Sequence, residues 1–547
     1  GIRVVVDAEV GQRPASAQRR DSRQRQSFAL DCERLGSMAM KRNLKISIFV
    51  TATVSLLVFQ NCGQAFRPNA SSESQSSTAV QSVFKCDPSQ DPTPTSARRL
   101  TKLELKQSFD LLLRESLSPA DQASIAGILA PLVSAIPDDS GAKFDSDDTF
   151  LSSTHTSAYL SLARTFAAEI FKSDVRLKAF WGTCASVTSL SDSCIDSFLA
   201  QGAAQILRRP LTAGEIVTFK TQMKTFASKQ GEFLLARLLL HPNFIFQVEV
   251  EGLEVKPGLV RISAYELASR LSFHLLKQGP DKALLAKAKD GSLLNGDTIR
   301  AEIARLSAAY PAQVSTGIDQ FFSGWLNFKN VANPVAGTTP EETAFSEGKV
   351  LSRQSLLNEI KNMTQYYVNE GQGSFDDLFL SPYSFASDSD LASIYQVGIW
   401  DPQTKPLIPF PNQERFGLLF RGAFLVSGSV RTSPITRGLK VRREVLCDTL
   451  TPPPAAIADM VRDPVEDPTL STRQRFHNKT SSTACMGCHA QINPLGFALE
   501  NFDAFGRFRT MEKVYDSTGL LLNQIPIDPI VQPLISMADA RTSKNPA

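Results

Sequence analysis

This sequence lacks the common motifs of hydrolases and nucleotide-binding proteins, and it has few of the histidines that bind zinc. The chain has only five histidines, and it contains no G-x-S-x-G, H-E-x-x-H or P-loop pattern. Lysine and arginine (58) nearly balance aspartate and glutamate (55), and no stretch forms a basic footprint for nucleic acid. Hydrolase and nucleotide-dependent functions therefore lack support, and we expect no nucleic-acid partner.

The most informative pattern that is present is Cys485-Met486-Gly487-Cys488-His489. C-x-x-C-H is the attachment signature of c-type haem, in which two thiols on one helical turn bond the vinyl groups and the imidazole ligates iron. The pattern predicts one covalent haem c, held by Cys485 and Cys488 with His489 as the proximal ligand. A zinc half-site and a chance match are the alternatives. Zinc normally needs a second, similarly spaced ligand pair, and the sequence has none.

Covalent haem is attached outside the cytoplasm, so the motif predicts an export signal. Residues 38–61 fit one, with a basic start and an apolar run from Ile46 to Phe59 that is too short to span a bilayer comfortably. Cys62 follows as a candidate lipidation site, which would anchor the chain to a membrane. Asn61 stands where a small residue is usual, and ordinary cleavage nearby is the alternative. We expect a periplasm-facing lipoprotein, in the bacterial outer membrane or, as the alternative that the sequence leaves open, in the inner membrane.

Three segments lie outside the predicted signal peptide and the predicted helical and haem domains. Residues 1–37 are rich in arginine and glutamine and precede a start at Met38 or Met40, so we interpret them as translated upstream sequence. Residues 62–96 are a Ser- and Pro-rich tether. Residues 516–547 resemble a loop-like, truncated tail. The chain after Cys62 would be nearly neutral.

The remaining cysteines support an oxidising compartment. Once the haem and lipid candidates and Cys32 are set aside, four cysteines remain, an even number that suggests two disulfides in an exported protein. Cys184 and Cys194 close a short polar loop. Cys86 with Cys447 is the pairing that is left by elimination.

Apolar residues recur at helical spacing through most of the chain. Leu105, Phe109 and Leu112 belong to one such stripe, and strand-like alternation is scarce. The fold class we predict is all-α, a multi-domain helical array with a C-terminal cytochrome-c-like haem segment. Pro- and Gly-rich breaks divide it into helical domains at 97–180, 181–255 and 256–400 and a haem domain at 401–515.

Several short blocks resemble the planctomycete-type cytochrome-c-like exported proteins, which are built from tandem domains of unknown function. The blocks span residues 98–104, 207–212, 266–272, 431–438 and 493–503. The resemblance covers roughly residues 96–515. It implies an exported haem-binding or electron-transfer protein without an established substrate, and it implies a further helical domain after the haem segment, where this chain has only its tail.

The sixth ligand of the haem iron decides what the haem could do, because a closed site suits electron transfer and an open one allows peroxide or oxygen chemistry. His477 is one candidate, and it matches a histidine found at that place in the family that this chain resembles. Met511 is another, since a methionine downstream of the motif ligates iron in many small cytochromes. An open position is the third alternative.

Two arginines are candidate partners for the propionate carboxylates of haem. Arg431 and Arg437 could each pair bidentately with a propionate, while Glu500 and Asp503 are competing partners that would make them structural. We expect the segment beginning at Pro494 to form a turn that covers the haem edge.

The function predicted from these patterns is electron transfer, by a haem-bearing subunit of a larger oxidoreductase system that meets a redox protein partner. Whether the chain is itself an enzyme stays open. One alternative is a haem peroxidase or oxidase with an open distal site. Another is a non-redox scaffold lipoprotein in which the motif is unused. The sequence does not identify a substrate.

Overall fold

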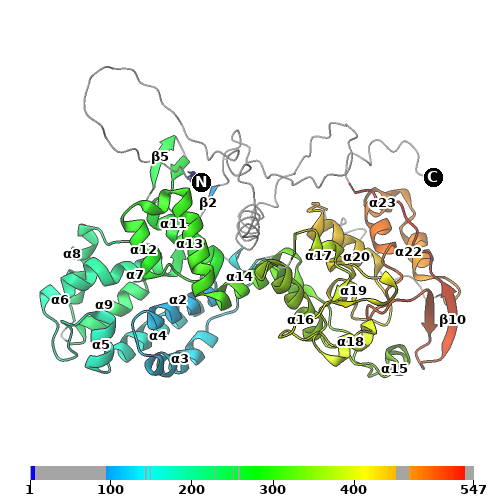
Figure 1. Ribbon diagram of the computed structural model, residues 1–547, viewed down its shortest axis with the longest axis horizontal. Helices are drawn as coiled ribbons and strands as arrows, with labels where there is room; N and C mark the ends of the chain where they lie inside the picture. Colours follow the sequence, from blue (N-terminus) through cyan, green and yellow to red (C-terminus); the bar gives the residue numbers. More distant parts are fainter. Residues whose placement is uncertain are drawn as a thin grey trace, which may run out of the picture. The chain divides into compact units, whose positions relative to one another are not determined.

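The computed structural model describes residues 2–5, 94–95, 97–141, 144–147, 150–226, 228–249, 252–256, 259–371, 373–450 and 467–535. These residues are mostly helical with a few short strands (Figure 1), as the all-α prediction requires. The chain divides into two compact units, residues 1–317 and residues 318–547. The predicted signal peptide, Cys62 and Cys86 lie outside the described residues.

The first unit is built mainly of helices, and the last of them continues past residue 317. Their bounds are α2 (Lys102–Arg114), α3 (Pro119–Ser134), α4 (Ser153–Ile170), α5 (Asp174–Trp181), α6 (Asp192–Ser197), α7 (Ala203–Leu207), α8 (Ala213–Met223), α9 (Gln230–Leu239), α10 (Pro242–Ile245), α11 (Ala264–Leu276), α12 (Lys282–Lys289), α13 (Gly296–Ala309) and α14 (Pro311–Trp325).

Helix α2 illustrates how local sequence starts these helices. Thr101 caps the helix by accepting a hydrogen bond from the Glu104 backbone N–H, and the Glu104 carboxylate accepts one from the Thr101 N–H. This capping box satisfies two backbone donors that the first turn leaves without partners. The apolar stripe then points inward, and the Phe109 ring packs 5.2 Å from both Phe166 and Phe244. The predicted helical stripe is confirmed.

The strands of the first unit are short. Strands β1 (Ile2–Val5), β2 (Pro94–Thr95), β5 (Leu253–Lys256) and β6 (Leu259–Arg261) form a sheet in the order β2-β1-β6-β5, and β3 (Arg98–Arg99) pairs with β4 (Phe246–Gln247). Cys184, which follows α5, and Cys194, which lies in α6, form a disulfide bond with their Cα atoms 5.7 Å apart. The Cys86–Cys447 pairing stays a prediction because Cys86 is not described.

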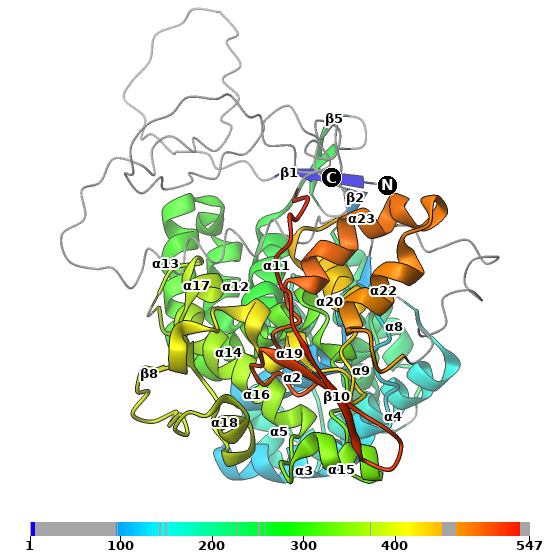
Figure 2. The ribbon, with the colours of Figure 1, turned by 90° about the vertical axis from the view of Figure 1, so that its right-hand side faces the viewer.

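The second unit carries the C-x-x-C-H motif. Its helices are α15 (Pro340–Ser346), α16 (Arg353–Thr364), α17 (Asp377–Leu380), α18 (Ser389–Tyr395), α19 (Gly422–Leu425), α20 (Pro434–Lys440), α22 (Thr472–Thr480) and α23 (Thr483–Phe497). Two antiparallel strand pairs accompany them, β7 (Tyr383–Ser384) with β8 (Ile408–Pro409), and β9 (Met511–Tyr515) with β10 (Leu521–Pro526). Helix α23 contacts both α20 and α22 (Figure 2).

None of the helices in the described ranges is at once long enough and apolar enough to cross a membrane.

Candidate functional site

The C-x-x-C-H residues lie on the first turns of α23. Cys488 stands three positions after Cys485, slightly less than one helical turn, and His489 follows directly. Cys488 is exposed, whereas Cys485 and His489 are half-buried. Neither cysteine takes part in a disulfide. The helix therefore presents two thiols and an imidazole that a ligand could reach together.

A second residue of α23 forms a hydrogen bond with the His489 ring. Its Nδ1 lies 2.9 Å from Oδ1 of Asn493, which is one helical turn further along. The Asn493 Nδ2 in turn donates to Oγ1 of Thr480 on α22 at 2.8 Å. Asn493 and Thr480 are both buried. Neither residue is among the site residues predicted from the sequence, although the spacing of four between His489 and Asn493 places these two on one helix face.

Helices α20 and α23 cross at unusually close range because glycines stand at the contact. A Cβ atom added at Gly496 would lie 1.9 Å from the Pro434 carbonyl oxygen, and one added at Gly438 would lie 2.1 Å from the Ile492 carbonyl oxygen. Only residues without a side chain permit this approach. The two glycines thus hold the motif helix directly against α20.

The predicted turn beginning at Pro494 is wrong. Residues 494–497 continue α23 as helix, which ends at the cap residue Ala498. Pro494 and Gly496 favour a break locally, but the packing of Gly496 against Pro434 keeps the segment helical. Binding of the haem edge by Pro494 stays a prediction.

The side chain of Arg437 forms hydrogen bonds with backbone carbonyl oxygens, most of them in the segment that follows α23. Its guanidinium donates to the carbonyl oxygens of Leu425, Leu499, Phe502 and Asp503. A guanidinium has five N–H groups, and these contacts engage all of them. Arg437 therefore joins the end of α19, at Leu425, to the residues that follow α23, and its pairing with a haem propionate stays a prediction.

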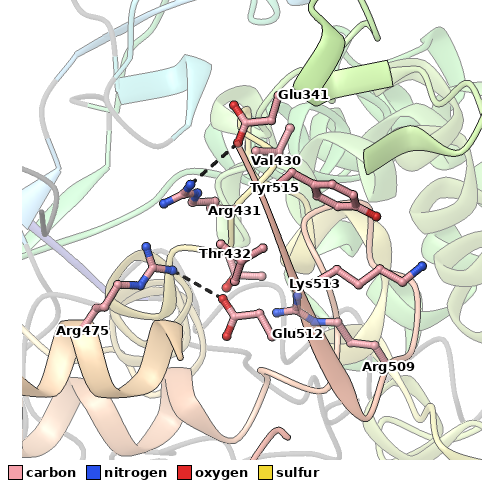
Figure 3. Close-up of a pocket in the computed structure, with 10 residues that line it drawn as sticks. Glu341, Val430, Arg431, Thr432, Arg475, Arg509, Glu512, Lys513 and Tyr515 are labelled. Carbon is pink, nitrogen blue, oxygen red and sulfur yellow. Dashed lines mark hydrogen bonds and ion pairs between the residues drawn. The ribbon is translucent and has the colours of Figure 1, made fainter. Parts of the chain in front are cut away.

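Arg431 lies in a small pocket that is rich in cations (Figure 3). Its Nη2 is 3.8 Å from Oε1 of Glu341, and the Nη2 of Arg475 is 3.4 Å from Oε1 of Glu512. The lining residues are Glu341, Val430, Arg431, Thr432, Arg475, Arg509, Glu512, Lys513, Val514 and Tyr515. Four of these side chains are cationic and two are carboxylates. This surrounding suits a carboxylate, and the pairing of Arg431 with a haem propionate stays a prediction.

The two candidate sixth ligands lie on different elements. His477 is exposed on α22, the helix that also carries Thr480. Met511 is exposed at the start of β9. In the described part of the chain, no group of three or more His, Cys, Asp or Glu residues is arranged to hold a metal ion.

Two family models match the chain. Residues 262–397 match PSD4, a protein of unknown function (DUF1592), and residues 415–512 match PSCyt3, a protein of unknown function (DUF1588). The two matches confirm the part of the resemblance that concerns tandem domains of unknown function. Searches of curated proteins and of solved structures find no match. The C-x-x-C-H motif lies inside the PSCyt3 segment.

A buried polar cluster joins the end of the PSD4 segment to the start of the PSCyt3 segment within the second unit. Glu359 and Arg421 form an ion pair at 3.3 Å, and neither side chain is exposed to solvent. The Tyr395 hydroxyl donates to the other Glu359 oxygen at 2.6 Å and accepts from the Gly422 N–H at 2.7 Å. Arg415 stacks over the Tyr395 ring at 4.2 Å. Burial raises the pKa of Glu359, and the charge of Arg421 opposes that rise.

Proposed function

We propose that this protein holds one covalent haem c on α23 and passes electrons to a redox partner protein. The observation that carries the proposal is the placement of a complete C-x-x-C-H sequence on the accessible start of a helix. Cys485 and Cys488 would hold the haem, and His489 would present its imidazole to the iron. The bound haem would supply a one-electron couple of ferric and ferrous iron.

The chemistry of the described residues fits this group. Cys485 and Cys488 are both thiols rather than disulfide partners. Each thiol would add across a vinyl double bond, its sulfur bonding one carbon and its hydrogen ending on the other, so that nothing is oxidised or reduced. Asn493 occupies Nδ1 of His489, which leaves the other ring nitrogen for a ligand.

The remaining parts of the proposal rest on the sequence. The export signal at 38–61 and the lipidation candidate Cys62 support a periplasm-facing, membrane-anchored protein. A single haem on so large a helical chain suggests that the other helices dock a redox partner.

The axial ligands distinguish a carrier from a haem enzyme. A carrier with both axial positions filled gives a low-spin ferric spectrum, so we expect one from the wild-type protein after loading with haem. Either His477→Ala or Met511→Ala should convert that spectrum to high-spin, while the other variant serves as the matched control and leaves it unchanged. Electronic absorption and electron paramagnetic resonance measure the spin state. A high-spin wild-type spectrum would contradict the carrier and favour an open-site enzyme.

A further inference from the structure

His489, Asn493 and Thr480 form a chain of hydrogen bonds in which the donor and the acceptor of each bond are fixed. The Thr480 Oγ1 donates to the Phe476 carbonyl oxygen at 2.7 Å. A hydroxyl group has a single proton, so Oγ1 faces Asn493 only as an acceptor, and the Asn493 Nδ2 fills that role as donor at 2.8 Å. The amide oxygen of Asn493 is thereby turned toward His489.

An amide oxygen can only accept a hydrogen bond, so Nδ1 of His489 must carry the proton in the 2.9 Å contact. The opposite orientation of the Asn493 amide would require Thr480 to donate to Asn493 and to give up its bond to Phe476. In the neutral imidazole the second nitrogen, Nε2, then keeps its lone pair. A histidine that binds a metal through Nε2 needs this lone pair. A hydrogen bond from the other ring nitrogen commonly fixes this tautomer.

We infer that Asn493 is a positioning residue that holds His489 as the Nδ1–H tautomer and sets the donor strength of Nε2 toward iron. The inference rests on the proposed haem site, but the tautomer itself is a property of the polypeptide. Asn493 is 5% exposed and Thr480 is 5% exposed, so water does not compete freely for their polar groups. The amide is a neutral acceptor, which strengthens the imidazole as a ligand less than a carboxylate would.

The tautomer is measurable in the full chain without haem. Histidine labelled with ¹⁵N gives distinct signals for Nδ1–H and Nε2–H, and subtraction of a His489→Gln spectrum assigns the ring. We expect Nδ1–H for His489 in the wild-type protein and in Thr480→Ser, which keeps the hydroxyl. Thr480→Val and Asn493→Leu should shift the ring toward Nε2–H, the form that histidine ordinarily prefers in water. An Nε2–H wild-type signal would overturn the inference.

The reduction potential of the loaded protein gives a second readout that a purely structural role would not produce. Asn493→Asp substitutes a stronger acceptor, increases the basicity of the imidazole and should lower the potential by stabilising ferric iron. Asn493→Leu removes the acceptor and should raise it. Equal potentials, or shifts of the same sign in both variants, would overturn the inference. If the wild-type chain takes up no covalent haem, the proposed function fails, while the ¹⁵N experiment still decides the tautomer.

Discussion

The Glu359→Leu variant is expected to lose about 3–5 kcal/mol of unfolding free energy in the second unit. Removing the carboxylate leaves the guanidinium of Arg421 buried without its counter-ion, and the Tyr395 hydroxyl loses its acceptor. A buried charge that has lost its partner cannot be solvated by water, so the folded state bears the cost. The midpoint of urea unfolding, followed by circular dichroism, measures the loss.

Two controls separate this effect from ordinary surface electrostatics. The double variant Glu359→Leu/Arg421→Leu removes both charges and should recover most of the lost stability, because apolar replacements of a buried pair are often neutral or better. Asp110→Ala breaks the exposed pair between Lys106 and Asp110 on α2 and should cost less than about 1 kcal/mol. A Glu359→Leu protein as stable as the wild type, or a double variant no better than the single one, would contradict the role of the pair.

Gly496→Ala should destabilise the second unit by about 3 kcal/mol, a large cost for one methyl group. The new Cβ would fall 1.9 Å from the Pro434 carbonyl oxygen, which is a backbone atom and cannot rotate away as a side chain would. Helices α20 and α23 would have to separate, and the motif helix would lose its support. Urea unfolding again gives the magnitude.

Gly487→Ala is the matched control on the same helix. A Cβ at Gly487 would meet nothing within 4 Å, and alanine in a helix is more stable than glycine by roughly 0.5–1 kcal/mol. This variant should therefore equal or exceed the wild type in stability. If the two alanine variants unfolded at the same urea concentration, the stability of the second unit would not depend on the close packing of α20 on α23 at Gly496.

Local patterns in the sequence predicted the helices well. The apolar spacing of Leu105, Phe109 and Leu112 marked α2. Such signals act within four residues, so they can be read without knowing the fold. The C-x-x-C-H residues are likewise contiguous, and the helix beneath them follows from their spacing.

Long-range contacts account for what the sequence did not reveal. Glu359 and Arg421 stand 62 residues apart, and nothing in the sequence near either residue indicates a buried partner. Pro494 and Gly496 predicted a turn because local propensity ignores the neighbouring helix that the glycine admits. Arg437 offered two interpretations, and only the fold brings four carbonyl oxygens around its guanidinium.

The most direct test of the account is a pyridine haemochrome spectrum of the polypeptide after acid-acetone extraction, on protein exported together with the cytochrome c maturation machinery. The wild type and the control Met486→Leu should keep their haem through the extraction, because thioether bonds to Cys485 and Cys488 survive it. The double variant Cys485→Ala/Cys488→Ala should release it. A colourless wild-type protein with both cysteines intact would contradict the haem site.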